Sequence, residues 1–248
     1  MIYDIVILTD CRYENPEKTD WYIEQILLED HLVQIALEKK GLKVIRKSWD
    51  AKDFDWAQSR CAIFRSTWDY FDRFGEFFSW FEKTRKVLEF INCPEIIYWN
   101  LDKHYLKDLK QSNINIPPTI FIEKGEQQSL NELFKKTEWT KAVLKPAIAG
   151  AARETFLIKK EEHLNYEKEL ERLIKNEAML FQEFQYQIQS KGEMSLIMID
   201  GKFTHAVLKK AKAGDFRVQD DFGGTVLDYT PNKEEIAFAE KAIAACPK

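Results

Sequence analysis

Short apolar runs alternate with segments of helical periodicity over the first hundred residues. Ile2–Leu8 (IYDIVIL) is typical of a strand buried on both faces, and Glu24–Lys40 repeats apolar side chains at helical spacing up to Gly41, which suits a C-terminal cap. Leu42–Ile45 and Cys61–Phe64 predict a second and a third strand. A strand, helix, strand order with short connections predicts a parallel sheet with crossover helices, and therefore a small doubly wound α/β domain.

The pattern changes after residue 100. A helix is predicted over Asp102–Gln111, a proline boundary follows at Ile116–Pro118, and a last helix is predicted over Lys233–Ala245. The Asp200-Gly201 pair is a strong signal for a two-residue hairpin. The predicted strands are Thr119–Ile122, Ala142–Lys145, Thr155–Ile158, Met179–Glu183, Met194–Ile199 and Phe203–Leu208. This half is therefore expected to be α+β with antiparallel pairs.

Composition narrows the class of protein. The 248 residues are 45% hydrophobic and 13% aromatic, enough for a sizeable core, and a net charge of −4 provides no overall field to hold nucleic acid or an anionic membrane. The four cysteines and four histidines are scattered, which disfavours disulfides and a zinc site. With no signal-peptide pattern or membrane-spanning apolar run, the expectation is a reduced, cytoplasmic protein with neither nucleic acid nor membrane as a partner.

The segment Arg65–Tyr70 (RSTWDY) follows the third predicted strand. Ligands of open α/β sheets bind outside the carboxyl ends of the strands, so Arg65, Ser66, Thr67 and Asp69 are candidates for gripping a small polar substrate. Arg65 could fork onto a carboxylate. The alternative is a turn that leads into a helix starting near Arg73, with the aromatic side chains only packing.

The segment Val143–Phe156 (VLKPAIAGAARETF) places Lys145 at the end of a strand, before a run of small residues. Such a lysine can reach phosphate oxygens from an apolar floor, while backbone N–H groups of the small residues approach the same anion. A Walker loop is excluded because no Gly-Lys-Ser/Thr follows. Taken alone, the segment fits a surface turn between two strands better.

Two further segments carry candidate chemistry. The segment Leu180–Phe184 (LFQEF) is a predicted strand that ends in a carboxylate, and its backbone could bind the edge of a heterocycle. A second carboxylate in the following Gly192-Glu193 could bind ribose hydroxyls. The alternative is an edge strand that ends in Glu for solubility. In Lys209–Gln219 (KKAKAGDFRVQ), the cations could neutralise a polyphosphate or an oxyanion, and a solvated face is the alternative.

The order of these features resembles the ATP-grasp ligases, in the branch of prokaryotic glutathione synthetase and the ribosomal-protein glutamate ligase. The resemblance covers most of the chain, and AKAGDFRVQ is its most specific segment. RSTWDY and NLDKHYLKDL are further similar to a subgroup near the amino-acid cyclo-ligase of cycloserine synthesis. The implied architecture is a Rossmann-like pre-ATP-grasp domain (1–100), then a two-part ATP-grasp fold with a lid subdomain (101–180) and a C-terminal subdomain (181–248) that is expected to be incomplete.

The resemblance implies roles for individual residues. Lys103 and Lys145 match the two lysines that hold nucleotide phosphates, Glu183 with the backbone of Phe184 matches the adenine-side hinge, and Glu193 matches the ribose-binding acid. Arg217 matches the arginine that steadies the acyl phosphate and is the candidate catalytic residue. The implied nucleotide-binding set is Lys103, Lys145, Gln182, Glu183, Phe184, Glu193, Lys210, Arg217 and Gln219.

The sequence departs from the family at two places. The loop after Lys145 has fewer glycines, and alanine adopts positive φ less freely. The family's magnesium ligands lie on two strands beyond the helix at Lys233–Ala245, and the sequence ends at Lys248, so a fragment of a longer protein or a degenerate nucleotide binder is expected. ATP and Mg²⁺ are the implied cofactors, with the metal ligands expected beyond Lys248 and no metal residue named.

The leading hypothesis is an ADP-forming, ATP-dependent carboxylate–amine ligase that acts on an amino acid or small peptide through an acyl phosphate. The alternative is a non-catalytic ATP-binding module. A Rossmann-type oxidoreductase is disfavoured because the first strand is followed by TDCRYE and not by GxGxxG. Family members are often dimers or tetramers, so a homo-oligomer stands as an open alternative to a monomer.

Overall fold

The computed structural model describes residues 2–218 and 222–247. The chain forms two compact units, Met1–Trp99 and Asn100–Pro247, and each is described by itself. The finer division of the second unit stays a prediction. A boundary between residues 180 and 181 would cut strand β8, which runs over Met179–Glu183, so we propose the division after that strand.

The first unit is built on a parallel sheet with the strand order β2-β1-β3-β4. Its strands are β1 (Tyr3–Thr9), β2 (Val44–Ser48), β3 (Ser59–Ser66) and β4 (Glu89–Ile91). Its helices are α1 (Cys11–Glu14), α2 (Trp21–Glu38), the short 3-10 helix η1 (Trp56–Gln58), α3 (Phe74–Thr84) and α4 (Pro94–Asn100), the last ending one residue into the second unit.

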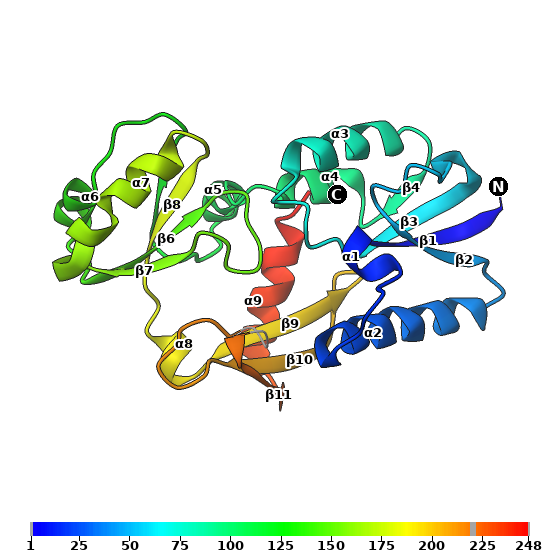
Figure 1. The fold of residues 1–248 in the computed structure, drawn as a ribbon. Helices are drawn as coiled ribbons and strands as arrows, with labels where there is room; N and C mark the ends of the chain where they lie inside the picture. The colour runs from blue at the N-terminus through cyan, green and yellow to red at the C-terminus, as the bar shows by residue number, and fades with distance from the viewer. Residues whose placement is uncertain (1, 219–221, 248) are drawn as a thin grey trace. The chain divides into compact units, whose positions relative to one another are not determined.

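Helices α2 and α3 cover opposite faces of this sheet (Figure 1). On the α3 side the core is aromatic: Phe77 and Phe81 pack against Phe64 of β3, and Phe81 also packs against Phe90 of β4. Central strand β1 is buried from Ile5 to Thr9 because both of its faces are covered, which is the reason Ile5–Leu8 reads as one continuous apolar run. The predicted doubly wound parallel arrangement is confirmed.

The predicted boundaries in this unit were displaced by a few residues. Helix α2 begins at Trp21 and not at Glu24, because the Asp20 carboxylate accepts the backbone N–H of Ile23 and caps the first turn. The second strand lies over Val44–Ser48, where polar residues continue the pairing with β1 beyond the apolar run. Gly41 has φ 82°, as its predicted capping position requires.

The second unit begins with α5 and a four-stranded antiparallel sheet of order β5-β8-β6-β7. Helices α6 and α7 carry apolar side chains that pack with the sheet in one core cluster, which includes Leu133, Leu144, Leu173 and Phe181. These elements are α5 (Tyr105–Gln111), β5 (Thr119–Ile122), α6 (Leu130–Thr137), β6 (Lys141–Pro146), β7 (Phe156–Lys159), the 3-10 helix η2 (Lys160–Tyr166), α7 (Glu167–Ile174) and β8 (Met179–Glu183).

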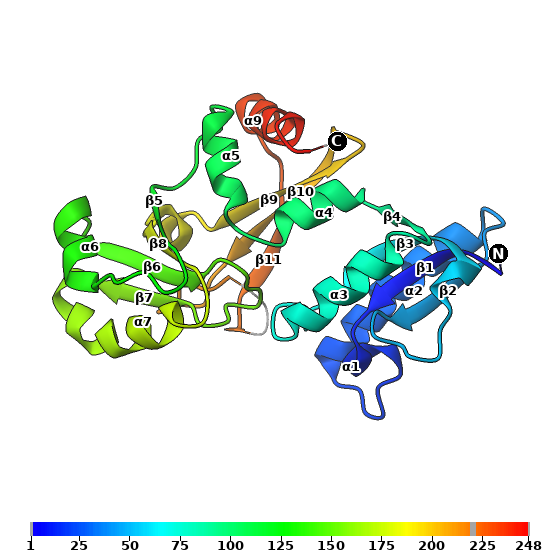
Figure 2. The ribbon, with the colours of Figure 1, turned by 90° about the horizontal axis from the view of Figure 1, so that it is seen from above.

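The remainder of this unit is a three-stranded antiparallel sheet of order β11-β10-β9. Its elements are α8 (Gln187–Ser190), β9 (Glu193–Ile199), β10 (Lys202–Lys210), β11 (Thr225–Tyr229) and α9 (Lys233–Ala244). The predicted hairpin is present, with Asp200 and Gly201 at φ 52° and 71°. Helix α9 lies beside this sheet and next to α5 (Figure 2), and Lys241 Nζ of α9 donates to the Asn113 carbonyl just after α5.

Two strands escaped prediction from the sequence. Strand β4 is only three residues long, and strand β11 has only Val226 and Leu227 between the polar residues Thr225 and Asp228, so both apolar stretches are too short to predict a strand. Both are added at the edge of a sheet by pairing with a neighbour, which is a tertiary effect.

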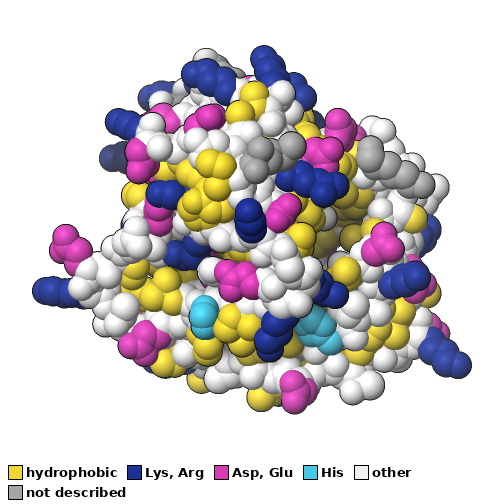
Figure 3. Space-filling model, turned by 90° about the vertical axis from the view of Figure 1, so that its right-hand side faces the viewer, with side chains coloured by type: hydrophobic (Ala, Val, Ile, Leu, Met, Phe, Trp, Pro, Cys, Tyr) yellow, Lys and Arg dark blue, Asp and Glu magenta, His cyan; other side chains and the backbone are white. Residues whose placement is uncertain are grey.

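The surface chemistry agrees with the near-balanced charge. Basic and acidic side chains are interspersed on the face drawn in Figure 3, and no patch of one sign extends across it. Among the described residues, no helix is both long and apolar enough to cross a bilayer. The four cysteines are free thiols.

Candidate active site

Strand β6 places Lys145 on the face of its sheet opposite the core. Alternate residues of β6 point to opposite faces, and Ala142 and Leu144 belong to the core cluster under α6 and α7. Lys145 and Val143 therefore project to the other face. The strand pattern in the sequence is sufficient to predict this orientation.

The Lys145 ammonium is held by a hydrogen-bonded chain across the sheet. Its Nζ donates to Gln182 Oε1 of β8 over 2.9 Å, Gln182 Nε2 donates to Thr119 Oγ1 over 2.8 Å, and that hydroxyl donates to the Pro117 carbonyl. In the β6–β8 register Gln182 stands opposite Val143, one diagonal step from Lys145 on the same face. Gln182 is buried, so this chain fixes the lysine's direction.

Lys103 reaches the same region from the segment before α5. Its backbone N–H donates to the Ala147 carbonyl over 3.0 Å, and its Nζ donates to the Ala149 carbonyl over 2.6 Å. Lys103 thus contacts the loop that follows Lys145, although 42 positions separate the two lysines in the sequence.

Burial lowers the pKa of both ammonium groups, and like charge lowers that of Lys103 further. The pKa of Lys103 falls to about 8, first through burial and then through the charges of Lys145 and Arg153. Burial also lowers the pKa of Lys145, against the opposing charge of Glu193. Two cations that repel one another in a partly buried site are stabilised by an anion between them, so the pair fits a phosphate-bearing ligand.

The end of β8 and the segment that follows it supply the other polar groups. Glu193 is exposed at the start of β9 and acts on Lys145 through its charge. The backbone N–H of Glu183 donates to the Pro118 carbonyl, and that of Phe184 donates to the Lys141 carbonyl, so both residues are anchored to neighbouring strands. The N–H of Phe184 is therefore engaged within the sheet, and the proposed hinge would rely on other groups of this segment.

Arg217 is fixed by its own loop. Its Nη2 donates to Asp215 Oδ2 over 2.8 Å, its Nε donates to the same carboxylate, and its guanidinium lies 3.8 Å from the centroid of the Phe222 ring. The Arg217 hydrogen bonds hold the pKa of Asp215 well below its ordinary value. The guanidinium is thereby oriented by a forked ion pair and an aromatic face.

A cavity of about 440 Å³ brings most of these residues together. The residues of its wall that the sequence singled out as nucleotide-binding are Lys103, Lys145, Gln182, Glu183, Phe184, Glu193 and Arg217. Lys210 is exposed at the end of β10, beside Gly192, and is not part of the described wall. Gln219 lies outside the described residues. That this set binds nucleotide stays a prediction.

One of the alternative interpretations is wrong. Strand β8 pairs with β5 on one side and β6 on the other, so LFQEF is an internal strand and not an edge. The turn between two strands is present at residues 151–154, between β6 and β7, but Lys145 precedes it on β6 and lies in the cavity wall. The basic segment divides: Lys210 and Lys212 are exposed as a solvated face would be, whereas Phe216, Arg217 and Val218 line the cavity.

The predicted substrate residues lie in the first unit, where the side chains of Arg65, Ser66 and Asp69 have hydrogen-bond or ion-pair partners. Arg65 forms ion pairs with Glu29 and with buried Asp30, and the Ser66 hydroxyl shares a 2.8 Å hydrogen bond with that of Thr9. Thr67 and Asp69 are buried. Asp69 accepts a hydrogen bond from the Trp49 indole and pairs with Arg73.

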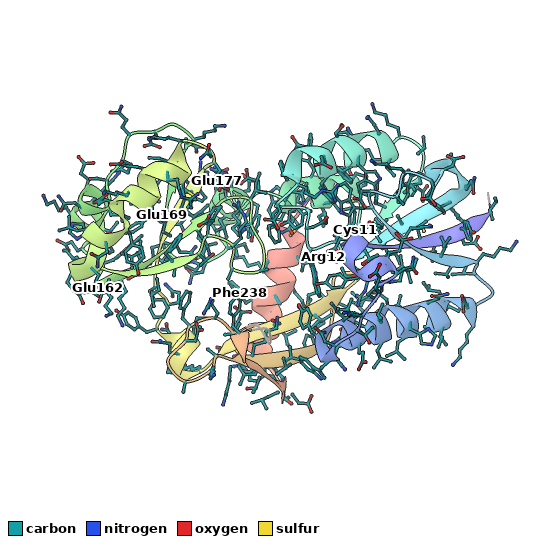
Figure 4. All side chains as sticks on the ribbon, viewed as in Figure 1. Cys11, Arg12, Glu162, Glu169, Glu177 and Phe238 are labelled. Atoms are coloured by element: carbon teal, nitrogen blue, oxygen red, sulfur yellow. The ribbon has the colours of Figure 1, made fainter. Side chains whose placement is uncertain are left out.

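Next to them lies α1, at the carboxyl end of β1, where Figure 4 labels Cys11 and Arg12. Arg12 Nη2 pairs with Asp10 Oδ2 at 2.6 Å. The carboxyl ends of β1 and β3 thus form one polar, largely self-paired cluster. Whether its members contact a substrate stays a prediction.

Several residues of the cavity wall were not predicted as site residues from the sequence. They are Pro117, Val143, Thr155, Gln185, Ile188, Phe216 and Val218. Strand alternation could have found Val143, which shares a face with Lys145, and Phe216 lies inside the most specific segment of the resemblance. Ile188 belongs to the four-residue helix α8, for which the sequence carries no distinct signal.

No metal centre is assigned. Within residues 2–218 and 222–247, no group of three or more His, Cys, Asp and Glu side chains is arranged to hold a metal ion. No role below depends on a metal ligand.

The lowered pKa of Lys103 predicts that the free energy of unfolding rises between pH 8 and 10. Its folded-state pKa of about 8 lies below the ordinary 10.5, so in this window the unfolded chain binds more protons and the free energy of unfolding increases with pH, by at most about 3 kcal/mol. Below pH 8 the lysine is charged in both states and the gain is absent. Urea unfolding at several pH values should show the full rise in the wild type and in Lys110→Met, an exposed control on α5, and a smaller rise in Lys103→Met, in which Lys145 still has a lowered pKa. Equal pH profiles of Lys103→Met and wild type would contradict the lowered pKa.

Comparisons with known sequences agree with this geometry. Residues 106–245, more than half of the chain, match the sequence model of the prokaryotic glutathione synthetase ATP-grasp domain, and residues 5–92 match that of the D-cycloserine synthetase DcsG N-terminal domain. The cycloserine biosynthesis protein DcsG of Streptomyces lavendulae is 25% identical over 167 residues, which are 66% of this chain and 56% of the relative. The alignment therefore spans little more than half of that relative's length.

Solved structures show the same fold. The D-cycloserine synthetase DcsG structure superposes with a TM-score of 0.79 at 23% identity, covering 97% of this chain and 80% of that chain. D-alanine–D-alanine ligase from Bacillus anthracis gives 0.62 at 17% identity, covering 98% and 77%. The RimK domain ATP-grasp protein from Sphaerobacter thermophilus gives 0.64 at 14% identity, covering 98% and 81%.

Proposed function

This chain belongs to the ATP-grasp family, in the branch of the prokaryotic glutathione synthetase domain, and from that premise we propose that it is an ATP-dependent carboxylate–amine ligase. In this reaction a carboxylate oxygen takes the γ-phosphoryl group of ATP, which leaves ADP. An amine then attacks the acyl carbon, an amide bond forms, and phosphate departs. The observation that supports the proposal most directly is the pair of lysines with lowered pKa, Lys103 and Lys145, in one cavity.

The residues present fit a nucleotide polyphosphate. ATP would supply the transferable phosphoryl group, and the two ammonium groups would neutralise its phosphates. Catalysis of this kind depends on positioning and on cations around the transferred group more than on a protein nucleophile. We propose that Arg217, pre-oriented by Asp215, stabilises the charge of the acyl phosphate as the amine displaces phosphate.

The remaining polar groups would bind the nucleoside and its phosphates. We assign Glu183 and Phe184 to the adenine side and Glu193 to the ribose, as the family resemblance implies, and we keep Gln182, Lys210 and Gln219 in the proposed nucleotide-binding set. Mg²⁺ is part of the proposal as the partner of ATP, without a residue of this chain assigned to it. A cytoplasmic location is part of it as well.

The substrate would be an amino acid or small peptide held at the carboxyl ends of β1 and β3. Arg65, Ser66, Thr67 and Asp69 are its proposed contacts. The Arg65 fork already faces Glu29, whose side chain is 65% exposed, so a substrate carboxylate would bind by displacing that glutamate. The match of residues 5–92 to the DcsG N-terminal domain supports an amino-acid-derived substrate.

A phosphate-release assay tests the proposal. The full-length protein, ATP and Mg²⁺ are incubated with a panel of amino acids and dipeptides, singly and in pairs, and phosphate is measured. Release that requires both a carboxylate and an amine is expected, with ADP as the second product. ATP binding without release over the whole panel would favour the non-catalytic module and reject the ligase.

A further inference from the structure

The loop between β6 and β7, residues 147–155, has an unusual backbone. Ala151, Ala152 and Glu154 have φ values of 47°, 55° and 48°, in the left-handed region that favours glycine. A side chain in this region costs about 1–2 kcal/mol per residue. Three such residues within four positions persist only if other contacts offset that cost.

Two ion pairs connect the loop to the C-terminal end of α7 and the turn that follows it. The Arg153 guanidinium forks onto Glu177, with Nη1 to Oε1 at 3.1 Å and Nη2 to Oε2 at 2.5 Å, and Nη2 also donates to the Ile148 carbonyl. Glu154 pairs with Arg172 of α7 at 2.8 Å. Glu177 lies in the turn between α7 and β8 (Figure 4), so both pairs anchor the loop to the same end of α7.

The Arg153–Glu177 pair is the more buried of the two. Each of its side chains is 25% exposed, whereas that of Arg172 is 50% exposed. A forked, partly buried arginine–carboxylate pair is stronger and more directional than an exposed one. This pair is therefore the main candidate for holding the strained backbone.

The loop forms one wall of the cavity. Residues 149–152 and Thr155 line it, and the Ala149 carbonyl accepts the Lys103 ammonium. Among the described residues, Arg153 and Glu177 do not belong to that wall. The pair therefore affects the cavity indirectly, through the backbone of the loop that lines it.

We propose that Arg153 and Glu177 are positioning residues that hold the alanine-rich loop in its left-handed conformation over the phosphates of ATP. The inference rests on the proposed function and adds how the chain keeps alanines in backbone conformations that favour glycine. If the pair holds this loop, it contributes to the affinity for the β- and γ-phosphates and not to the affinity for adenosine and its first phosphate.

The test compares ATP with AMP by titration calorimetry. In Glu177→Gln, which keeps the shape and removes the charge, the affinity for ATP should fall about tenfold while that for AMP stays the same. Arg153→Lys, which keeps the charge but loses the fork, should give the same selective loss. Glu162→Gln is the matched control, because Glu162 pairs with Lys159 elsewhere in the same unit, and its ATP affinity should equal that of the wild type (Figure 4).

Glycine rescue separates positioning from general stability. Adding Ala151→Gly and Ala152→Gly to Glu177→Gln should restore ATP affinity, because glycine adopts positive φ without the side-chain cost. An equal loss for ATP and AMP, or no rescue by the glycines, would overturn the positioning role. Wild-type binding of ATP with unchanged binding in Glu177→Gln rejects this inference alone, whereas no nucleotide binding by the wild type rejects the proposed function with it.

Discussion

Replacing Asp30 by alanine is expected to lower the free energy of unfolding of the first unit by about 3–5 kcal/mol. Asp30 is only 2% exposed, and its carboxylate binds Arg46 Nε at 2.7 Å. Arg46 is itself largely buried and donates to the Tyr13 carbonyl, so it cannot turn to solvent when its partner is removed. An unpaired buried guanidinium accounts for the size of the loss. Urea unfolding followed by tryptophan fluorescence measures it.

Glu29 provides the matched control for Asp30. It precedes Asp30 on α2 and pairs with Arg65, but its side chain is 65% exposed. Glu29→Gln should therefore change stability by less than about 1 kcal/mol. If Asp30→Ala were as mild as Glu29→Gln, the buried pair would not be the structural centre of the first unit, and Arg46 would have to be solvated in solution.

Replacing Lys145 by alanine is expected to weaken ATP binding by about 1.5–3 kcal/mol, or roughly 10- to 150-fold. The loss reflects one charge-assisted contact with phosphate from an ammonium that the Gln182 chain already orients. Calorimetric titration with ATP measures it. A thermal melt of the same sample separates the loss from unfolding, since Gln182 is buried and loses a hydrogen-bond donor.

Lys141→Ala is the control for Lys145→Ala. Lys141 lies on the same strand, and its ammonium stands 5.2 Å from the Tyr186 ring centroid, outside the described cavity wall. Its loss removes the same charge from β6 without a predicted phosphate contact. Equal ATP affinities of the Lys145 and Lys141 variants would contradict the assignment of Lys145 to phosphate.

The candidate site could be predicted from the sequence only in part. Lys145 was found because a strand pattern ends in a lysine and small residues, and alternation along β6 sets its direction. The pairing of Arg65 with Glu29 and Asp30 could not be predicted, because it joins residues 36 and 35 positions apart through the packing of α2 on the sheet. The same limit applies to Arg153 and Glu177, which lie 24 positions apart.

The sequence by itself determined the local properties of this protein. Apolar runs specified most strands, Asp200-Gly201 specified a hairpin, and the order of charged motifs identified the family, because each depends on neighbouring residues or on their sequence order. Only the tertiary structure decided that Lys103 meets the loop after Lys145, which lowers the pKa of both lysines by burying them together. It also placed Arg153 of that loop against Glu177, 24 positions away in the sequence, and this is the pair that we propose offsets the cost of alanines in the conformation of glycines.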